Sequence, residues 1–317
     1  MTSGHATMPI ASCAPILLSG LAEVAGRYDG YIIDLWGTVH DGVEAYAAAI
    51  DVLRRVRAQG APVCLLSNAA RSTAAIAARL AGFGLDAGCY DHLVSSGQAT
   101  IEAFRQPDCW HAALGRTYYL ISLDDGEHLL EGLGYTRIED PSEGAFVLNT
   151  GSTPGTDLAH YERVLRACAR RNLPMICANP DLLVRIADRR IMCAGMIARR
   201  YETLGGEVRY HGKPDRAIYQ ECLKRMKRPA HAVLAVGDGL ETDIAGARGM
   251  GMDSVFVLGG LHAESLSETG AAPALDRLQA LFARSGRAPT YVIPYLRWQA
   301  PTRRSSARAS IEEARGR

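Results

Sequence analysis

Tyr31-Ile-Ile-Asp-Leu-Trp-Gly-Thr38 is an apolar, strand-like stretch that runs into a polar turn containing Asp34. The same design recurs three times, at residues 63–68, 208–214 and 233–243. Strand patterns that alternate with helical patterns favour a parallel sheet with right-handed crossovers. Because ligands of an open parallel sheet bind beyond the carboxyl ends of its strands, we expect the four polar ends to meet at one site.

This expected site combines three carboxylates, one ammonium and one hydroxyl. The residues are Asp34, Asp238 and Asp243, Lys213, and Ser67. Magnesium-assisted transfer of a phosphoryl group to an aspartate needs such a set. Asn68 adds an amide beside the hydroxyl, where a phosphate oxygen needs donors. Taken singly, each residue has a structural explanation in turn capping, helix-end acids or a solvated surface, so their combination supports the prediction.

The composition excludes several classes of partner. The chain has 317 residues, 48% hydrophobic and 22% charged, which is ordinary for a globular protein long enough for two domains. Its net charge of +1 provides no basic field for nucleic acid or anionic lipid. Eight scattered cysteines without a CxxC pair favour reduced thiols over disulfides or zinc. The longest apolar run near the amino terminus, residues 14–18, is too short to span a membrane, so we expect a cytoplasmic protein.

The order of strand and helix patterns predicts an α/β fold with a Rossmann-like core, in which helices cover both faces of a parallel sheet. Between about residues 117 and 190 the rhythm changes, which indicates an inserted α/β module. We expect core at 1–112, the module at 113–190, core again at 191–298 and a disordered tail at 299–317. The second core segment includes a helix over 192–204 and the strand that leads to Lys213.

In this order and context, the four stretches resemble the haloacid dehalogenase superfamily of aspartate-nucleophile hydrolases, from about residue 28 to 261. The similarity is greatest to its class IIA branch, which includes sugar-phosphate, nucleotide and pyridoxal-phosphate phosphatases. Further matching segments are Gly37-Thr38, Asp41-Gly42, residues 95–100, Asn179-Pro180-Asp181, Gly212-Lys213-Pro214 and Thr242-Asp243-Ile244. The inserted module falls where that branch has an α/β cap domain.

The resemblance implies a role for each matching residue. Asp34 would attack phosphorus and form an aspartyl-phosphate that water then hydrolyses. Mg²⁺ would be bound by Asp34, the backbone carbonyl of Trp36 and Asp238, with Asp243 supporting it from further out. Ser67 and Lys213 would hold the phosphoryl oxygens, and the cap would select a small phosphorylated metabolite. Relatives of this class often dimerise through the cap, so the resemblance also implies a homodimer.

Trp36 departs from the pattern of the superfamily, whose phosphatases usually have a second Asp at this position to protonate the leaving oxygen. An indole cannot transfer a proton near neutral pH, although its peptide carbonyl can still bind metal. General acid-base assistance is typically worth about 10²–10⁴ in rate, so a slow phosphatase is expected unless something compensates. We consider three explanations: His40 or Asp41 substitutes, the substrate carries a good leaving group, or Trp36 packs between core and cap.

Two other functions are compatible with these residues. Dehalogenases of the superfamily have an aromatic residue near the nucleophile because halide departs without a proton, but they work without magnesium, whereas this chain keeps Asp238 and Asp243. Alternatively, the chain is a binding protein that kept the hydrolase scaffold after losing its acid. The retained Asp34 and Lys213 argue against such decay, so a magnesium-dependent phosphatase is the favoured interpretation.

Overall fold

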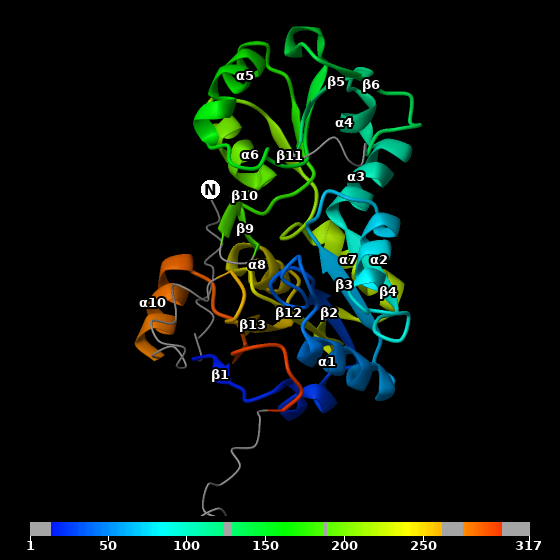
Figure 1. Cartoon of the computed structure of the whole chain (residues 1–317), viewed down its shortest axis with the longest axis vertical. Coiled ribbons are helices and arrows are strands. Elements are labelled where there is room, and N and C mark those ends of the chain that lie inside the picture. The colour runs from blue at the N-terminus through cyan, green and yellow to red at the C-terminus, as the bar shows by residue number, and fades with distance from the viewer. Residues whose placement is uncertain (1–13, 123–128, 187–188, 262–274, 300–317) are drawn as a thin grey trace, which may run out of the picture.

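The computed structural model describes residues 14–122, 129–186, 189–261 and 275–299. These residues form two α/β units, one above the other in Figure 1, each built around its own parallel sheet. Seven strands form the lower sheet and five form the upper one, and a separate two-stranded hairpin lies between them in this view. None of the described helices has the length and apolar character that crossing a membrane requires.

The lower sheet has the strand order β1-β14-β13-β12-β2-β3-β4, and every pair is parallel. Its strands are β1 (Ile16–Leu17), β2 (Gly30–Asp34), β3 (Val63–Ser67), β4 (His92–Ser95), β12 (Val233–Gly237), β13 (Asp253–Val257) and β14 (Tyr291–Ile293). The central strands β2, β3 and β12 are buried along their whole length. Such continuous apolar runs are typical of strands covered on both faces.

Helices cover both faces of this sheet, as the sequence predicts. Alternate side chains of β2 point to opposite faces: Tyr31 and Ile33 share a core with α1 (Ala47–Ala58) and α2 (Thr73–Gly82). Ile32 packs instead with α7 (Arg216–Met226) and α8 (Ala245–Gly249). Helix α10 (Leu275–Ser285) packs near the sheet edge on β13 and β14. The predicted Rossmann-like core is therefore confirmed.

The upper sheet has the order β11-β8-β7-β5-β6, again with parallel pairs. Its strands are β5 (Thr117–Ile121), β6 (Thr136–Ile138), β7 (Phe146–Asn149), β8 (Met175–Cys177) and β11 (Val208–Tyr210). One core joins this sheet to α5 (Leu158–Arg170) and α6 (Ala194–Thr203). A second core joins it to α3 (Ser96–Arg105), with α4 (Cys109–Ala112) alongside. The hairpin consists of β9 (Leu183–Ile186) and β10 (Arg189–Met192).

The packing differs from the predicted segment boundaries on both sides of the inserted module. The boundary at residue 112 puts α3 in the core, although Ile101 and Phe104 of this helix pack with the upper sheet. The boundary at residue 190 puts α6 and β11 in the core, but β11 pairs with β8 and α6 packs against the upper sheet. An amphipathic helix does not reveal in its sequence which of two sheets it covers, so the periodicity could not decide this. We therefore propose that the inserted unit extends through β11. The predicted disordered tail lies outside the described residues beyond Gln299.

Candidate active site

The four polar ends meet at the carboxyl edge of the lower sheet. Asp34 ends β2, Ser67 ends β3, and Asp238 directly follows β12. Because β12, β2 and β3 are neighbours, these side chains start from adjacent strands. Lys213 comes from the turn between β11 and α7, and Asp243 from the single helical turn Leu240–Ile244. The convergence that the sequence predicts is therefore present in the structure.

Lys213 is the centre of the cluster. Its Nζ lies 2.5 Å from Asp34 Oδ1 and 2.9 Å from Asp243 Oδ1, and all three residues are buried. Burial acts to lower the pKa of Lys213, but Asp243 and Asp34 outweigh it and raise that pKa well above its ordinary value. The ammonium therefore stays charged and orients Asp34 from one side.

Asn68 fixes the backbone of this lysine. Its Oδ1 accepts the Lys213 N–H at 2.7 Å, and its Nδ2 donates to the Lys213 carbonyl at 3.2 Å and to Asp181 Oδ1 at 2.8 Å. Asn68 thus links the end of β3 to two segments far along the chain. The expected contact of Asn68 with a phosphate oxygen remains a prediction.

The three carboxylates form a set that suits a divalent cation. Ligand atoms of Asp34, Asp238 and Asp243 lie within 4.8 Å of one another, and all three residues are buried. Burial, with the neighbouring carboxylates, raises the pKa of Asp34 well above its usual range even though Lys213 opposes the shift. Burial and Asp243 raise the pKa of Asp238 to about 7. When all three carboxylates are ionised, they leave two negative charges in excess over the one ammonium, and a hard divalent ion would balance these charges.

The turn after β2 is built to let Asp238 approach. Gly37 has φ +78°, and a Cβ there would lie 2.1 Å from Asp238 Oδ2. Only glycine combines this backbone conformation with the required space. On its other side, Asp238 Oδ2 accepts the Leu261 N–H at 2.7 Å, which fixes the carboxylate beside Asp34.

Trp36 connects the two units. Its indole Nε1 donates to the backbone carbonyl of Arg185 in β9 at 2.7 Å. The ring lies edge-on to His40 with centroids 5.2 Å apart, and the Arg79 guanidinium lies 5.8 Å from the ring centroid. A Cβ at Gly42 would come within 2.6 Å of the indole, so the glycine makes room for it. These contacts support the interpretation that Trp36 packs between core and cap.

The structure gives no support to His40 or Asp41 as a substitute acid. His40 is buried, and burial, with the nearby Arg79, lowers its pKa to about 4, so the ring is neutral at pH 7. Its Nδ1 accepts the Gly42 N–H at 3.0 Å. Asp41 accepts two backbone N–H groups of the following turn, from Val43 and Glu44. Through these hydrogen bonds, both side chains hold the conformation of the loop after β2.

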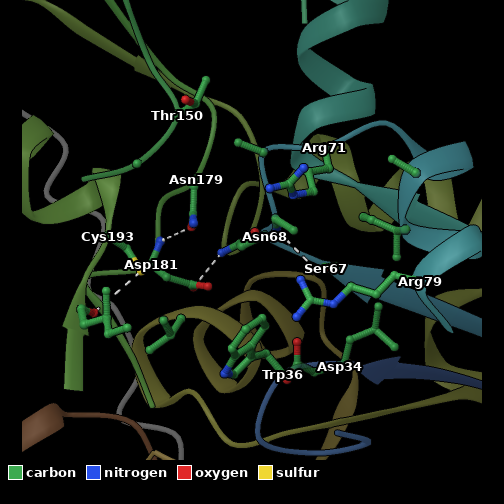
Figure 2. Close-up of a pocket in the computed structure, with 18 of the residues that line it drawn as sticks. Asp34, Trp36, Ser67, Asn68, Arg71, Arg79, Thr150, Asn179, Asp181 and Cys193 are labelled. Carbon is green, nitrogen blue, oxygen red and sulfur yellow. Dashed lines mark hydrogen bonds between the residues drawn. The ribbon is translucent and has the colours of Figure 1, made fainter. Parts of the chain in front are cut away.

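Asp181 is a site residue that the sequence interpretation did not select. In the sequence, Asn179-Pro180-Asp181 is only one of the segments that match the family. In the structure this carboxylate lies in the pocket beside Asn68 (Figure 2), and burial raises its pKa while Lys213 opposes that shift. One signal for Asp181 is present in the sequence: an acid in the short loop that follows the buried strand β8, although the sequence does not show which way this side chain points.

Two adjoining cavities open at Asp34. A small one of about 40 Å³ lies over the carboxylates and is lined by Lys213, Asp238 and Asp243. A larger one of about 220 Å³ extends toward the upper unit and is drawn in Figure 2. The two share four lining residues: Asp34, Trp36, Asp181 and Val184. A phosphoryl group in the small cavity would thus point its leaving group into the large one.

A parallel-sheet core with a lysine-centred carboxylate cluster at its carboxyl edge, below a second α/β unit, defines a class of capped α/β hydrolases. The chain belongs to the haloacid dehalogenase-like hydrolase family, whose model matches residues 28–251. A second model, HAD-hydrolase-like, matches residues 210–298.

Named relatives and solved structures agree with this assignment. D-glycerol 3-phosphate phosphatase of Mycobacterium tuberculosis is 28% identical over 86% of this chain and 71% of the relative. A haloacid dehalogenase-like hydrolase of Brucella suis superposes with a TM-score of 0.75 at 30% identity, covering 88% of this chain and 99% of the other. A glycerol phosphate phosphatase of Mycobacterium tuberculosis, solved in complex with magnesium, gives 0.58 at 25% identity, covering 85% and 75%.

Proposed function

We propose that this chain is a magnesium-dependent phosphatase that acts on a small phosphorylated metabolite through an aspartyl-phosphate on Asp34. The observation that carries the proposal is the junction of the two cavities at Asp34, with a carboxylate cluster and Lys213 on one side and space for an organic group on the other. The phosphatase relatives and the magnesium-bound one among the solved structures support it.

Residues of this chain account for each requirement of the reaction. Asp34, the carbonyl of Trp36, Asp238 and Asp243 would hold the ion, which when bound neutralises the carboxylates and the phosphoryl oxygens so that two anions can meet. Lys213 fixes the Asp34 carboxylate by its 2.5 Å contact and supplies a positive charge for the phosphoryl group. Ser67 offers its hydroxyl from the adjacent strand end, and the upper unit limits the access of water.

The test is phosphate release from a panel of phosphomonoesters, with and without Mg²⁺, by the natural protein and by Asp34→Asn. We expect turnover that needs Mg²⁺ and is abolished in Asp34→Asn, since an amide cannot form the phosphoenzyme. Release that persists in Asp34→Asn would contradict the proposal.

Magnesium with beryllium fluoride separates a catalytic site from a binding scaffold. A competent site should be stabilised against heat by this phosphate mimic, because it binds the folded state only. Stabilisation together with no turnover on any ester would favour the binding protein. Halide release from a haloacid without Mg²⁺ would favour the dehalogenase.

A further inference from the structure

The large cavity surrounds the place where the leaving group of a substrate would lie, and Trp36 forms part of its wall. The Trp36 N–H is already donated to the Arg185 carbonyl, and the indole has no proton to give at neutral pH. His40 also lines the cavity, but its neutral ring accepts the Gly42 N–H through Nδ1, and Asp41 accepts two backbone N–H groups of the loop after β2. These three positions near the nucleophile therefore provide no proton for a leaving oxygen.

What the cavity provides instead is positive charge. Arg71 and Arg79 line it, and Figure 2 shows both side chains directed into it from the α2 side, opposite Asp181 and Asn179. A guanidinium remains protonated under all relevant conditions, so it stabilises an anion without transferring a proton. Its planar fork matches a carboxylate or phosphate oxygen pair in two parallel hydrogen bonds.

Arg79 is held in place for such a role. Its Nη2 donates to the Gly42 carbonyl at 2.7 Å, and the guanidinium lies over the rings of Trp36 and Phe83, 5.8 Å and 5.6 Å from their centroids. In the described part of the chain, no carboxylate lies within ion-pair distance of Arg79. Its charge is thus oriented by neutral groups and remains available to an anion in the cavity.

From this arrangement we propose that the natural substrate is a phosphorylated compound with an acidic leaving group, of which an acyl phosphate is the type. The inference rests on the proposed phosphatase function and specifies its substrate class. An Asp34 oxygen bonds to phosphorus while the bond from phosphorus to the leaving oxygen breaks. The electron pair stays on that oxygen, which departs as an anion beside Arg71 and Arg79 and needs no proton. Water then releases phosphate from Asp34 and restores its carboxylate.

The test measures kcat/KM with Mg²⁺, because this ratio covers the steps up to departure of the leaving group. The panel contains acetyl phosphate, an alkyl phosphate, and substituted phenyl phosphates whose leaving groups have pKa values from about 5 to 10. We expect kcat/KM to fall by about 10²–10⁴ from the most acidic to the least acidic leaving group, the range that a general acid would otherwise supply.

Variants identify the groups responsible. Arg79→Met should lower kcat/KM by about 10–100-fold, which corresponds to the loss of one hydrogen bond to a charged group. Arg79→Lys keeps the positive charge, so its kcat/KM should lie between those of Arg79→Met and the natural protein. Arg71→Met, in the same cavity, repeats the test should Arg79→Met fail to fold. Asp181→Asn should leave the dependence on leaving-group pKa unchanged.

Two results would overturn the inference while the phosphatase function stands. One is an alkyl phosphate hydrolysed as fast as acetyl phosphate. The other is a weak dependence on leaving-group pKa that becomes strong in Asp181→Asn, which would make Asp181 the proton donor. Absence of Asp34-dependent phosphate release from every member of the panel would instead refute the proposed function itself.

Discussion

Replacing Asp238 by Asn should stabilise the metal-free protein and abolish its turnover. Burial and Asp243 raise the pKa of Asp238 to about 7, so the fold disfavours its ionised form. Among the described residues, its carboxylate accepts a hydrogen bond from the Leu261 N–H at 2.7 Å, which an amide oxygen can accept equally well. The substitution therefore removes a charge with little change of shape.

The sign and size of the effect follow from linkage. An acid whose folded pKa lies above its unfolded value stabilises the fold fully below the unfolded pKa, and this contribution is lost as pH rises through the folded pKa. With a folded pKa of about 7 against the ordinary 3.8, at 1.36 kcal/mol per unit, burying Asp238 costs roughly 4 kcal/mol at pH 8, where it is ionised, and roughly 2 kcal/mol at pH 5.5, where it takes up a proton on folding. Asn avoids this cost at either pH.

Urea unfolding in EDTA at these two pH values measures the difference in the free energy of unfolding. Asp238→Asn should be more stable than the natural protein, with the larger gain at pH 8. Glu241→Gln is a matched control in the same loop, because its half-exposed carboxylate pairs with Arg287 outside the cluster. A loss of stability at pH 8, or an equal gain at both pH values, would refute the reasoning that this site is strained by excess negative charge.

Three further predictions concern the same groups. Lys213→Met leaves Asp34 and Asp243 buried without their ammonium, so the free energy of unfolding in EDTA, measured by urea titration, should fall by about 3–5 kcal/mol. An unchanged free energy of unfolding would contradict the role of Lys213 in stabilising these carboxylates. Mg²⁺ should raise the melting temperature of the natural protein more at pH 8 than at pH 5.5, because protons compete with the ion for Asp238. An equal rise at both pH values would show that Asp238 does not bind the metal. Trp36→Phe loses the hydrogen bond to the Arg185 carbonyl, worth about 1 kcal/mol, and should speed amide exchange in β9 but not in β2; unchanged exchange in β9 would show that this contact does not hold the hairpin.

The residues at strand ends could be predicted because a parallel sheet brings its carboxyl ends to one edge whatever the intervening chain does. Asp34, Ser67 and Asp238 follow buried runs, so their position needed only the strand pattern.

Features that depend on contacts between the two units could not be predicted in the same way. The predicted boundaries place β11 in the core, yet this strand pairs with β8 in the upper sheet. The position of the Asp181 side chain depends on a hydrogen bond from Asn68, which lies more than a hundred residues away along the chain. Propensity and periodicity report on neighbours in sequence, and neither carries information on which distant unit a loop will face.

Trp36 brings these two kinds of information together. In the sequence, Trp36 shows only that the usual acid is missing. In the structure, its ring packs against Gly42, His40 and Arg79, and its N–H donates a hydrogen bond to the Arg185 carbonyl in β9. A carboxylate at this position would have neither the N–H that reaches β9 nor the aromatic face that orients the guanidinium of Arg79. The side chain that stands in place of the usual acid therefore also orients the guanidinium of Arg79 in the large cavity, so the missing proton donor and the anion stabilisation that we propose both depend on Trp36.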